Sequence, residues 1–266
     1  MGATTHGYLH RAARLANQGE GYVRLRPNES TRYGSETLVA AVTAAAQSVQ
    51  HAFPGGHPLR IGDLSSRRGG AHARHASHRS GRDVDLLFYM RDAGGLSAQG
   101  AAWGRVDEFG VSSAQSTPVF FDTARNWHLV RTLLLDEDAR VKWIFVSNDL
   151  KARLLRYAAQ HETSPKAIAR AAWVLHQPSH GDPHADHFHV RVGCSAIEAQ
   201  LGCRERAPFW PWLGDASRKT GSRAGASASD AELVRWLLAE EHVDQGGHVA
   251  RGRLDAAAKP ALVAGR

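Results

Sequence analysis

Two short stretches of the chain concentrate side chains that can bind a metal ion or move protons. The first, HASHRSGRDVDL, covers residues 75–86, and the second, HGDPHADHFHVRV, covers residues 180–192. Imidazole nitrogens and carboxylate oxygens are ligands that Zn²⁺ takes in proteins. Each stretch runs into an apolar segment with the character of a β-strand, and we expect the two stretches to form one site.

The second stretch presents two histidines in one direction. His187 and His189 are two residues apart on the predicted strand 187–193, so both imidazoles project from the same face while the alternate side chains enter the core. An isolated His-x-His pair is more commonly an ordinary surface feature. His184, in the preceding loop of Gly, Asp and Pro residues, favours a functional cluster instead.

The first stretch supplies the complementary ligands. His78 lies in a loop and Asp85 on the predicted strand 83–90, with Gly81 allowing the chain to turn between them. An ionised carboxylate within an apolar strand is costly unless it is paired or metal-bound. His78, Asp85 and His189 would give two nitrogens and one oxygen to one Zn²⁺ per chain. The fourth position then stays open for water, as in catalytic zinc sites.

Such a site can hydrolyse an amide bond. Zinc lowers the pKa of a bound water to about 7, and a second base then moves protons between that water and the leaving amine. His187 shares the face of His189 without being needed as a ligand, so we interpret it as this base. His184 and His75 could contact the developing oxyanion or orient the ligands. Asp83 and Asp186 are candidate acceptors around them, or solvated loop residues.

The two stretches resemble those of the penicillin-insensitive murein endopeptidases, within the wider group of lysostaphin-type, D-Ala-D-Ala and hedgehog-type zinc domains. The group pattern is His, two residues, Gly, three residues, Asp and a later His-x-His, matched here by His78, Gly81, Asp85, His187 and His189. The narrower match adds Ser77, Asp83 and the run HFHVR with a cysteine three residues later. The resemblance covers roughly residues 20–205.

The resemblance implies a zinc-dependent D,D-endopeptidase that cleaves D-alanyl–meso-diaminopimelyl cross-links of peptidoglycan without a serine nucleophile. By matching positions, the zinc ligands are His78, Asp85 and His189 and the base is His187, with His75 and His184 lining the site. The implied fold is α+β, a small antiparallel sheet flanked by helices like that of the hedgehog and D-Ala-D-Ala peptidase domains. The implied location is the periplasm or the exterior of the cell.

Two rival functions stay open. A D-Ala-D-Ala carboxypeptidase or dipeptidase of the same group would need a cation for the terminal carboxylate, and Arg79, Arg82 and Arg191 are candidates. A non-catalytic hedgehog-like zinc module would bind the cell wall or a protein, although the retained His187 argues against it. Nucleic-acid binding has only the net charge of +7 in its favour, with no recognisable motif.

The remaining sequence agrees with a globular α+β domain at 1–213, followed by a Gly/Ala/Ser-rich linker at 214–229 and a helical tail at 230–266. No stretch is long and apolar enough for a membrane span. Apolar periodicity, β-branched content and capping residues predict helices at 35–53, 122–134, 148–161 and 164–175 and strands at 58–65, 83–90, 117–122, 141–147 and 187–193.

The two cysteines bear on where the protein acts. Cys194 and Cys203 are nine residues apart, so they form either a disulfide that closes a short loop or a pair of reduced thiols. An exported protein should hold them as a disulfide. The first residues show no basic segment followed by an apolar one, so no signal peptide is visible. The family resemblance implies export nonetheless.

Overall fold

The computed structural model describes residues 1–214. The segments predicted as a linker at 214–229 and a helical tail at 230–266 lie outside the described residues, apart from Gly214. The division of the chain after residue 213 therefore stays a prediction.

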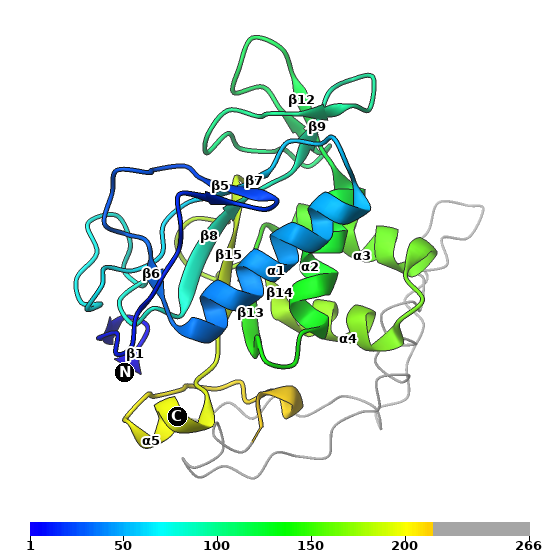
Figure 1. The fold of residues 1–266 in the computed structure, drawn as a ribbon. Helices are drawn as coiled ribbons and strands as arrows, with labels where there is room; N and C mark the ends of the chain where they lie inside the picture. The colour runs from blue at the N-terminus through cyan, green and yellow to red at the C-terminus, as the bar shows by residue number, and fades with distance from the viewer. Residues whose placement is uncertain (215–266) are drawn as a thin grey trace, which may run out of the picture.

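A seven-stranded sheet with the order β14-β13-β15-β8-β7-β5-β4 is the centre of the described chain (Figure 1). Its strands are β4 (Gln18–Gly19), β5 (Tyr22–Arg24), β7 (Leu59–Ile61), β8 (Asp83–Leu87), β13 (Val141–Phe145), β14 (Leu175–His176) and β15 (His187–Val192). Strands β13, β15, β8 and β7 pair antiparallel in turn. The predicted α+β class is confirmed.

The sheet is larger and more mixed than the small antiparallel sheet expected from the sequence. Strand β14 pairs parallel with β13, and β5 pairs parallel with β7. Parallel neighbours need a long crossover connection. Helix α1 (Glu36–Ala52) provides it between β5 and β7, and α3 (Asn148–His161) with α4 (Pro165–Val174) provides it between β13 and β14. The predicted helices are thus the crossover connections of the two parallel strand pairs.

Capping residues fix the start of three helices, as the sequence indicates. The Ser35 side chain accepts a hydrogen bond from the Leu38 amide at 3.2 Å before α1, and Asp122 accepts one from the Arg125 amide at 3.1 Å before α2 (Thr123–Leu135). Ser164 caps α4, whose first residue is a proline. Two short helices follow the last strand, α5 (Ala196–Gln200) and the 3₁₀ helix Pro211–Leu213. None of the described helices meets the length and apolarity that a membrane crossing requires.

Three small sheets surround the large one. The pairs are β1 (Gly2–Ala3) with β2 (His6–Gly7), and β3 (Ala13–Arg14) with β6 (Tyr33–Gly34). A four-stranded sheet contains β9 (Met90–Arg91), β10 (Ser97–Ala98), β11 (Val111–Ser112) and β12 (Val119–Phe121), and β9 and β12 lie at the top of Figure 1. The predicted strand at 83–90 is therefore divided between β8 and β9, which belong to different sheets.

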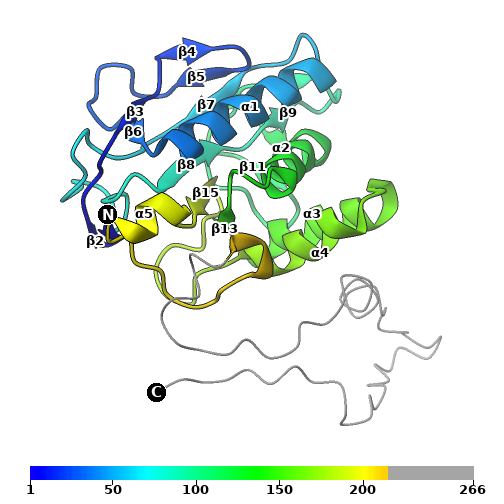
Figure 2. The same cartoon turned by 60° about the horizontal axis from the view of Figure 1, so that its bottom comes forward.

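The two faces of the large sheet have different roles. Helices α1 to α4 are grouped together on one side of β8, β13 and β15 (Figures 1 and 2). The core side chains of β8 and β15 are Val84, Leu86, Phe188, Val190 and Val192. Because side chains alternate along a strand, the residues between them face the other side. That other face carries the aspartates and histidines singled out in the sequence.

Candidate metal centre

The strand register brings the two histidine-rich stretches together on that second face. His189 on β15 lies opposite Asp85 on β8 and, on its other side, opposite Phe145 on β13. Two residues earlier on β15, His187 lies opposite Leu87. The candidate ligands and the candidate base therefore project from neighbouring positions of one rigid surface, which limits how far they can drift from one another.

The carboxylate of Asp85 is the centre of the cluster. Its Oδ1 lies 3.3 Å from His78 Nε2, 3.4 Å from His187 Nε2 and 3.4 Å from His189 Nδ1. Its Oδ2 lies 3.3 Å from His75 Nε2. Nitrogen and oxygen ligands at 2.0–2.1 Å from a tetrahedral Zn²⁺ are roughly 3.3 Å from one another. The separations of Oδ1 from the three nitrogens have the spacing of a zinc coordination shell.

The ligand atoms of His78 and Asp85 lack hydrogen-bond partners. His78 Nε2 and both carboxylate oxygens of Asp85 are buried without a hydrogen-bond partner, although each lies near other polar atoms. Buried polar atoms in native proteins are almost always hydrogen-bonded, so such exceptions point to an additional group. The residues present fit a metal ion. His75, His78 and Asp85 form one set with ligand atoms within 4.8 Å of one another, and His184, His187 and His189 form another.

Hydrogen bonds on the far side of each ring determine which nitrogen faces the cluster. His78 Nδ1 donates to the Leu64 carbonyl at 3.0 Å, so Nε2 is the nitrogen available to a metal. His189 Nε2 donates to Asp83 Oδ1 at 2.9 Å, which leaves Nδ1 directed at Asp85. The structure thus brings Asp83 against a candidate ligand, in the place expected of an orienting acceptor.

The charges of the cluster are set by burial and by neighbouring ions. Burial alone would raise the pKa of Asp85, but the histidines around it, His78 foremost, hold that pKa well below its ordinary value. Burial lowers the pKa of His189 to about 4 against the opposing effect of Asp83. Asp85 is therefore ionised and His189 neutral at pH 7, which are the forms that bind metal ions.

His187 has a carboxylate partner of its own. Its Nδ1 lies 2.7 Å from Asp186 Oδ1, and the ring contacts the indole of Trp103 edge-on with centroids 5.1 Å apart. Burial lowers the pKa of His187, but the hydrogen bond with Asp186 and the nearby charge of Asp85 outweigh that effect and raise it to about 9. A carboxylate–imidazole pair of this kind is how enzymes hold a general base in one orientation.

His184 and His75 lie beside other histidines of the cluster. The His184 ring lies 5.0 Å from that of His187 and 5.5 Å from that of His189, measured between centroids. Its Nδ1 donates to the Asp182 carbonyl at 2.8 Å, and burial is the main cause that lowers its pKa. The His75 ring stacks on that of His78 with centroids 4.2 Å apart.

Two of these histidines have a left-handed backbone. The φ angles are +60° for His78 and +55° for His184, and only five non-glycine residues among residues 1–214 have positive φ. Such conformations cost free energy and concentrate at functional sites. The sequence does not reveal this feature, because neither residue is a glycine or an asparagine.

A buried aspartate that sequence reasoning missed supports the site from behind. Asp63 is fully buried and accepts hydrogen bonds from Thr31 Oγ1 at 2.7 Å, Arg26 at 3.1 Å and Arg74 at 2.9 Å. Its Oδ2 is also 3.2 Å from His75 Nε2, so His75 bridges Asp63 and Asp85. The signal was present in the sequence, since Asp63 follows the short strand β7 as an unexplained carboxylate.

The arginines considered as cations for a substrate carboxylate are mostly engaged within the chain. Arg82 Nη1 donates to Glu205 at 3.0 Å, and Arg191 Nε donates to Asp83 at 2.6 Å. Arg79 Nε is buried and has no hydrogen-bond partner. Arg82 and Arg191 therefore have carboxylates of their own, which removes the main reason to assign them a substrate carboxylate.

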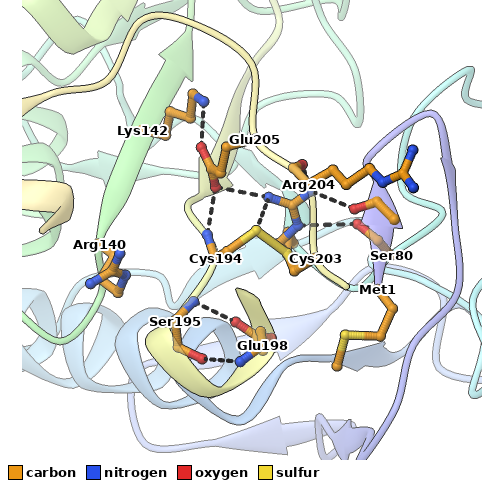
Figure 3. The surroundings of a disulfide bond; sticks show 12 residues. Met1, Ser80, Arg140, Lys142, Cys194, Ser195, Glu198, Cys203, Arg204 and Glu205 are labelled. Atoms are coloured by element: carbon orange, nitrogen blue, oxygen red, sulfur yellow. Dashed lines mark hydrogen bonds and ion pairs between the residues drawn. A yellow bond between two sulfur atoms is a disulfide. The ribbon is translucent and has the colours of Figure 1, made fainter. Parts of the chain in front are cut away.

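Cys194 and Cys203 form a disulfide (Figure 3), which confirms the oxidised alternative. Beside it, Glu205 accepts hydrogen bonds from the Cys194 amide at 2.5 Å, from Arg82 and from the Lys142 ammonium. Figure 3 shows Glu205 between Lys142 and Cys194. Arg82 belongs to the loop between His78 and Asp83, and Lys142 belongs to β13. The segment after the disulfide therefore ties the ligand-bearing loop to the sheet.

Comparison with known proteins identifies the family of the chain. A sequence model of the penicillin-insensitive murein endopeptidases matches residues 1–236. The chain belongs to this family. A penicillin-insensitive murein endopeptidase of Haemophilus influenzae is 30% identical over 217 residues, 78% of this chain and 67% of that protein. One of Pectobacterium atrosepticum is 26% identical over 243 residues, 89% of this chain and 74% of that protein. The predicted family is confirmed, and with it the class of peptidases.

Proposed function

We propose that this chain is a zinc-dependent murein D,D-endopeptidase that hydrolyses D-alanyl–meso-diaminopimelyl cross-links. The observation that carries the metal is the buried Asp85 carboxylate, whose Oδ1 lies 3.3–3.4 Å from three imidazole nitrogens while neither of its oxygens has a hydrogen-bond partner. The family supplies the substrate class, because its relatives are named as murein endopeptidases. Peptidoglycan lies outside the cytoplasm, so we place the activity in the periplasm or beyond.

His78, Asp85 and His189 would hold one zinc ion per chain. When bound, zinc supplies Lewis acidity and lowers the pKa of a coordinated water to about 7. The three ligand groups come from one loop and two paired strands. His75 Nε2 donates to Asp63 and so keeps its ring beside the Asp85 carboxylate, at 3.3 Å from Oδ2. Asp83 accepts a hydrogen bond from His189 Nε2 and so orients that ring. This outer layer keeps the ligands oriented before the metal arrives.

His187 moves the protons of the reaction. In the metal-free chain the raised pKa of His187 keeps the ring protonated, but a cation held by Asp85 would offset that carboxylate and lower the pKa. Nε2 could then take a proton from the attacking water and return it to the nitrogen of the leaving amine. Asp186 keeps the hydrogen on Nδ1 and stabilises the imidazolium that forms, as the 2.7 Å contact allows. The side chain of His187 is 11% exposed whereas that of His78 is fully buried, so His187 is the better placed of the two to meet the substrate.

For His184 we propose a role other than the oxyanion contact considered from the sequence. Because Nδ1 donates to the Asp182 carbonyl and burial lowers the pKa, the neutral ring directs an unprotonated Nε2 away from that carbonyl. Such a nitrogen accepts a hydrogen bond and cannot donate one to an oxyanion. We assign His184 to orienting the attacking water as an acceptor.

A digest of defined muropeptides tests the proposal. Purified chain is stripped with a chelator, assayed, and assayed again after addition of one equivalent of Zn²⁺. We expect cross-linked muropeptide to be cleaved to its two monomers only with zinc, and benzylpenicillin to have no effect. Full activity in a folded protein shown by elemental analysis to be metal-free would refute the proposal. Faster cleavage of free D-Ala-D-Ala than of the cross-link would favour the carboxypeptidase or dipeptidase alternative.

A further inference from the structure

Arg60 lies on the same face of the sheet as the candidate base. Strands β7 and β8 pair with Ile61 opposite Leu86, and β8 and β15 pair with Leu87 opposite His187. The antiparallel register therefore puts Arg60 beside Leu87, in the row that contains His187. Neighbouring strands are 4.7–4.9 Å apart, so Arg60 and His187 are separated by about 10 Å between their backbones.

Arg60 is also a cation without a counter-charge in the described chain. Its side chain is half-buried, yet within residues 1–214 the guanidinium has no ion pair with a carboxylate and no hydrogen bond to an acceptor. Burial lowers its pKa, and no neighbouring charge contributes to that shift. Arg82 and Arg191, by contrast, each contact a buried carboxylate. A partly buried cation without a counter-charge loses part of its hydration, and a bound anion would supply the missing charge.

The hollow lined by Arg60 extends to Asp186, the partner of the proposed base His187. Two adjoining depressions share Arg60, Leu87, Phe88 and Met90 in their walls. One of them is also lined by Asp186, the partner of His187, and by the small residues Gly100, Ala101 and Gly104. Apart from Asp186, whose carboxylate is already bonded to His187, the walls of both depressions contain no acidic side chain.

We propose that Arg60 binds a carboxylate of the substrate, the one on the amino acid that leaves when the cross-link is cut. This inference rests on the proposed function. In a D-alanyl–diaminopimelyl link, the carbon next to the leaving nitrogen carries a free carboxylate. Since His187 delivers the proton to that nitrogen, the carboxylate must lie within a few atoms of His187. A guanidinium in the same row, at the end of a hollow with small and apolar walls, matches a short aliphatic group that carries one negative charge.

The test pairs a protein change with a substrate change. The substrates are a cross-linked muropeptide with that carboxylate free and the same compound with it amidated. Wild-type protein should prefer the free acid. Arg60→Gln should lower kcat/KM for the free acid by about 10- to 100-fold, mostly through KM, and leave the amidated substrate unchanged. Arg60→Lys should recover part of the loss. Arg67→Gln, at an exposed arginine, is the control and should match wild type on both substrates.

Several outcomes overturn the assignment. If wild-type protein cleaves both substrates equally well, there is no subsite for the carboxylate. This outcome needs no variant, so the test works even if Arg60→Gln fails to fold. An Arg60→Gln protein that loses both substrates in proportion shows a role other than carboxylate binding. If wild-type protein with zinc cleaves neither substrate, the proposed function itself has failed, and the three results are distinguishable.

Discussion

Two buried carboxylates, Asp85 and Glu205, show how alike a structural and a functional cluster can look in composition. Both are at most 4% exposed, and both lie among cationic or potentially cationic side chains contributed by distant parts of the chain. Glu205 is hydrogen-bonded by the Cys194 amide, Arg82 and Lys142. Asp85 has histidine nitrogens at 3.3–3.4 Å and no hydrogen bond to either oxygen.

The two clusters are alike in burial and charge, and they differ in whether the carboxylate oxygens are hydrogen-bonded. The Glu205 cluster is complete within the chain, so it can stabilise the fold without any ligand. The Asp85 cluster becomes complete only when another group joins it. A buried polar network that is only partly satisfied is costly, and proteins retain it where function requires it. Unsatisfied atoms, more than the number of histidines, therefore identify which of the two clusters is the candidate metal centre.

The largest effect should come from removing a ligand of the incomplete cluster. His189→Ala removes a nitrogen directed at Asp85, so we expect zinc and activity to be lost together, with zinc content measured by elemental analysis of the purified protein. His10→Ala changes an exposed histidine and should keep both. A His189→Ala protein that retains one zinc per chain would show that the ligand set is different from the one proposed.

A smaller loss of activity, without loss of metal, should follow from removing the base. His187→Ala leaves the three proposed ligands, so zinc content should be unchanged while kcat falls by about 10²–10⁴-fold. Asp186→Asn should lower kcat less, because the imidazole remains but loses its charged partner. Since His187 Nε2 lies 3.4 Å from Asp85 Oδ1, loss of zinc in His187→Ala would instead make His187 a ligand.

The complete cluster should respond in stability rather than in metal content. Glu205→Ala leaves Arg82 and Lys142 buried without their carboxylate, which should lower the free energy of unfolding by about 3–5 kcal/mol, measured by urea denaturation of the zinc-free protein. Glu137→Ala removes an exposed partner of Lys166 and should not shift the unfolding midpoint. Equal midpoints for the two variants would mean that the Glu205 cluster is not the stabilising network described above.

Features with a local cause were predictable from the sequence. Alternation along a strand suffices to put His187 and His189 on one face. Ser35, Asp122 and Ser164 predict where their helices begin, because capping depends only on the next few residues. The parallel strand pairs were not predicted, because the sequence alone did not reveal which strands the crossover helices would bring side by side.

Features that depend on distant partners were not predictable. Asp63 was visible as a carboxylate, but its four donors come from residues 26, 31, 74 and 75 and meet it only in the folded chain. The sequence offered Arg82 and Arg191 as cations for a substrate, and the fold pairs them with Glu205 and Asp83. That Arg60 has no partner among residues 1–214 is a property of the whole surrounding structure.

The smallest expected effect concerns the disulfide next to Glu205. Replacing Cys194 and Cys203 by serine removes the closure of a short loop, which should cost at most ~3 kcal/mol in the chain-entropy model, most of it through the unfolded state. Because Glu205 would still be bonded to Arg82 and Lys142, zinc content and kcat should be unchanged well below the unfolding temperature. Urea denaturation with and without reductant measures the stability term on the native chain. If the double variant instead loses zinc, the disulfide is needed to hold the segment that positions Arg82, and the two clusters are coupled rather than independent.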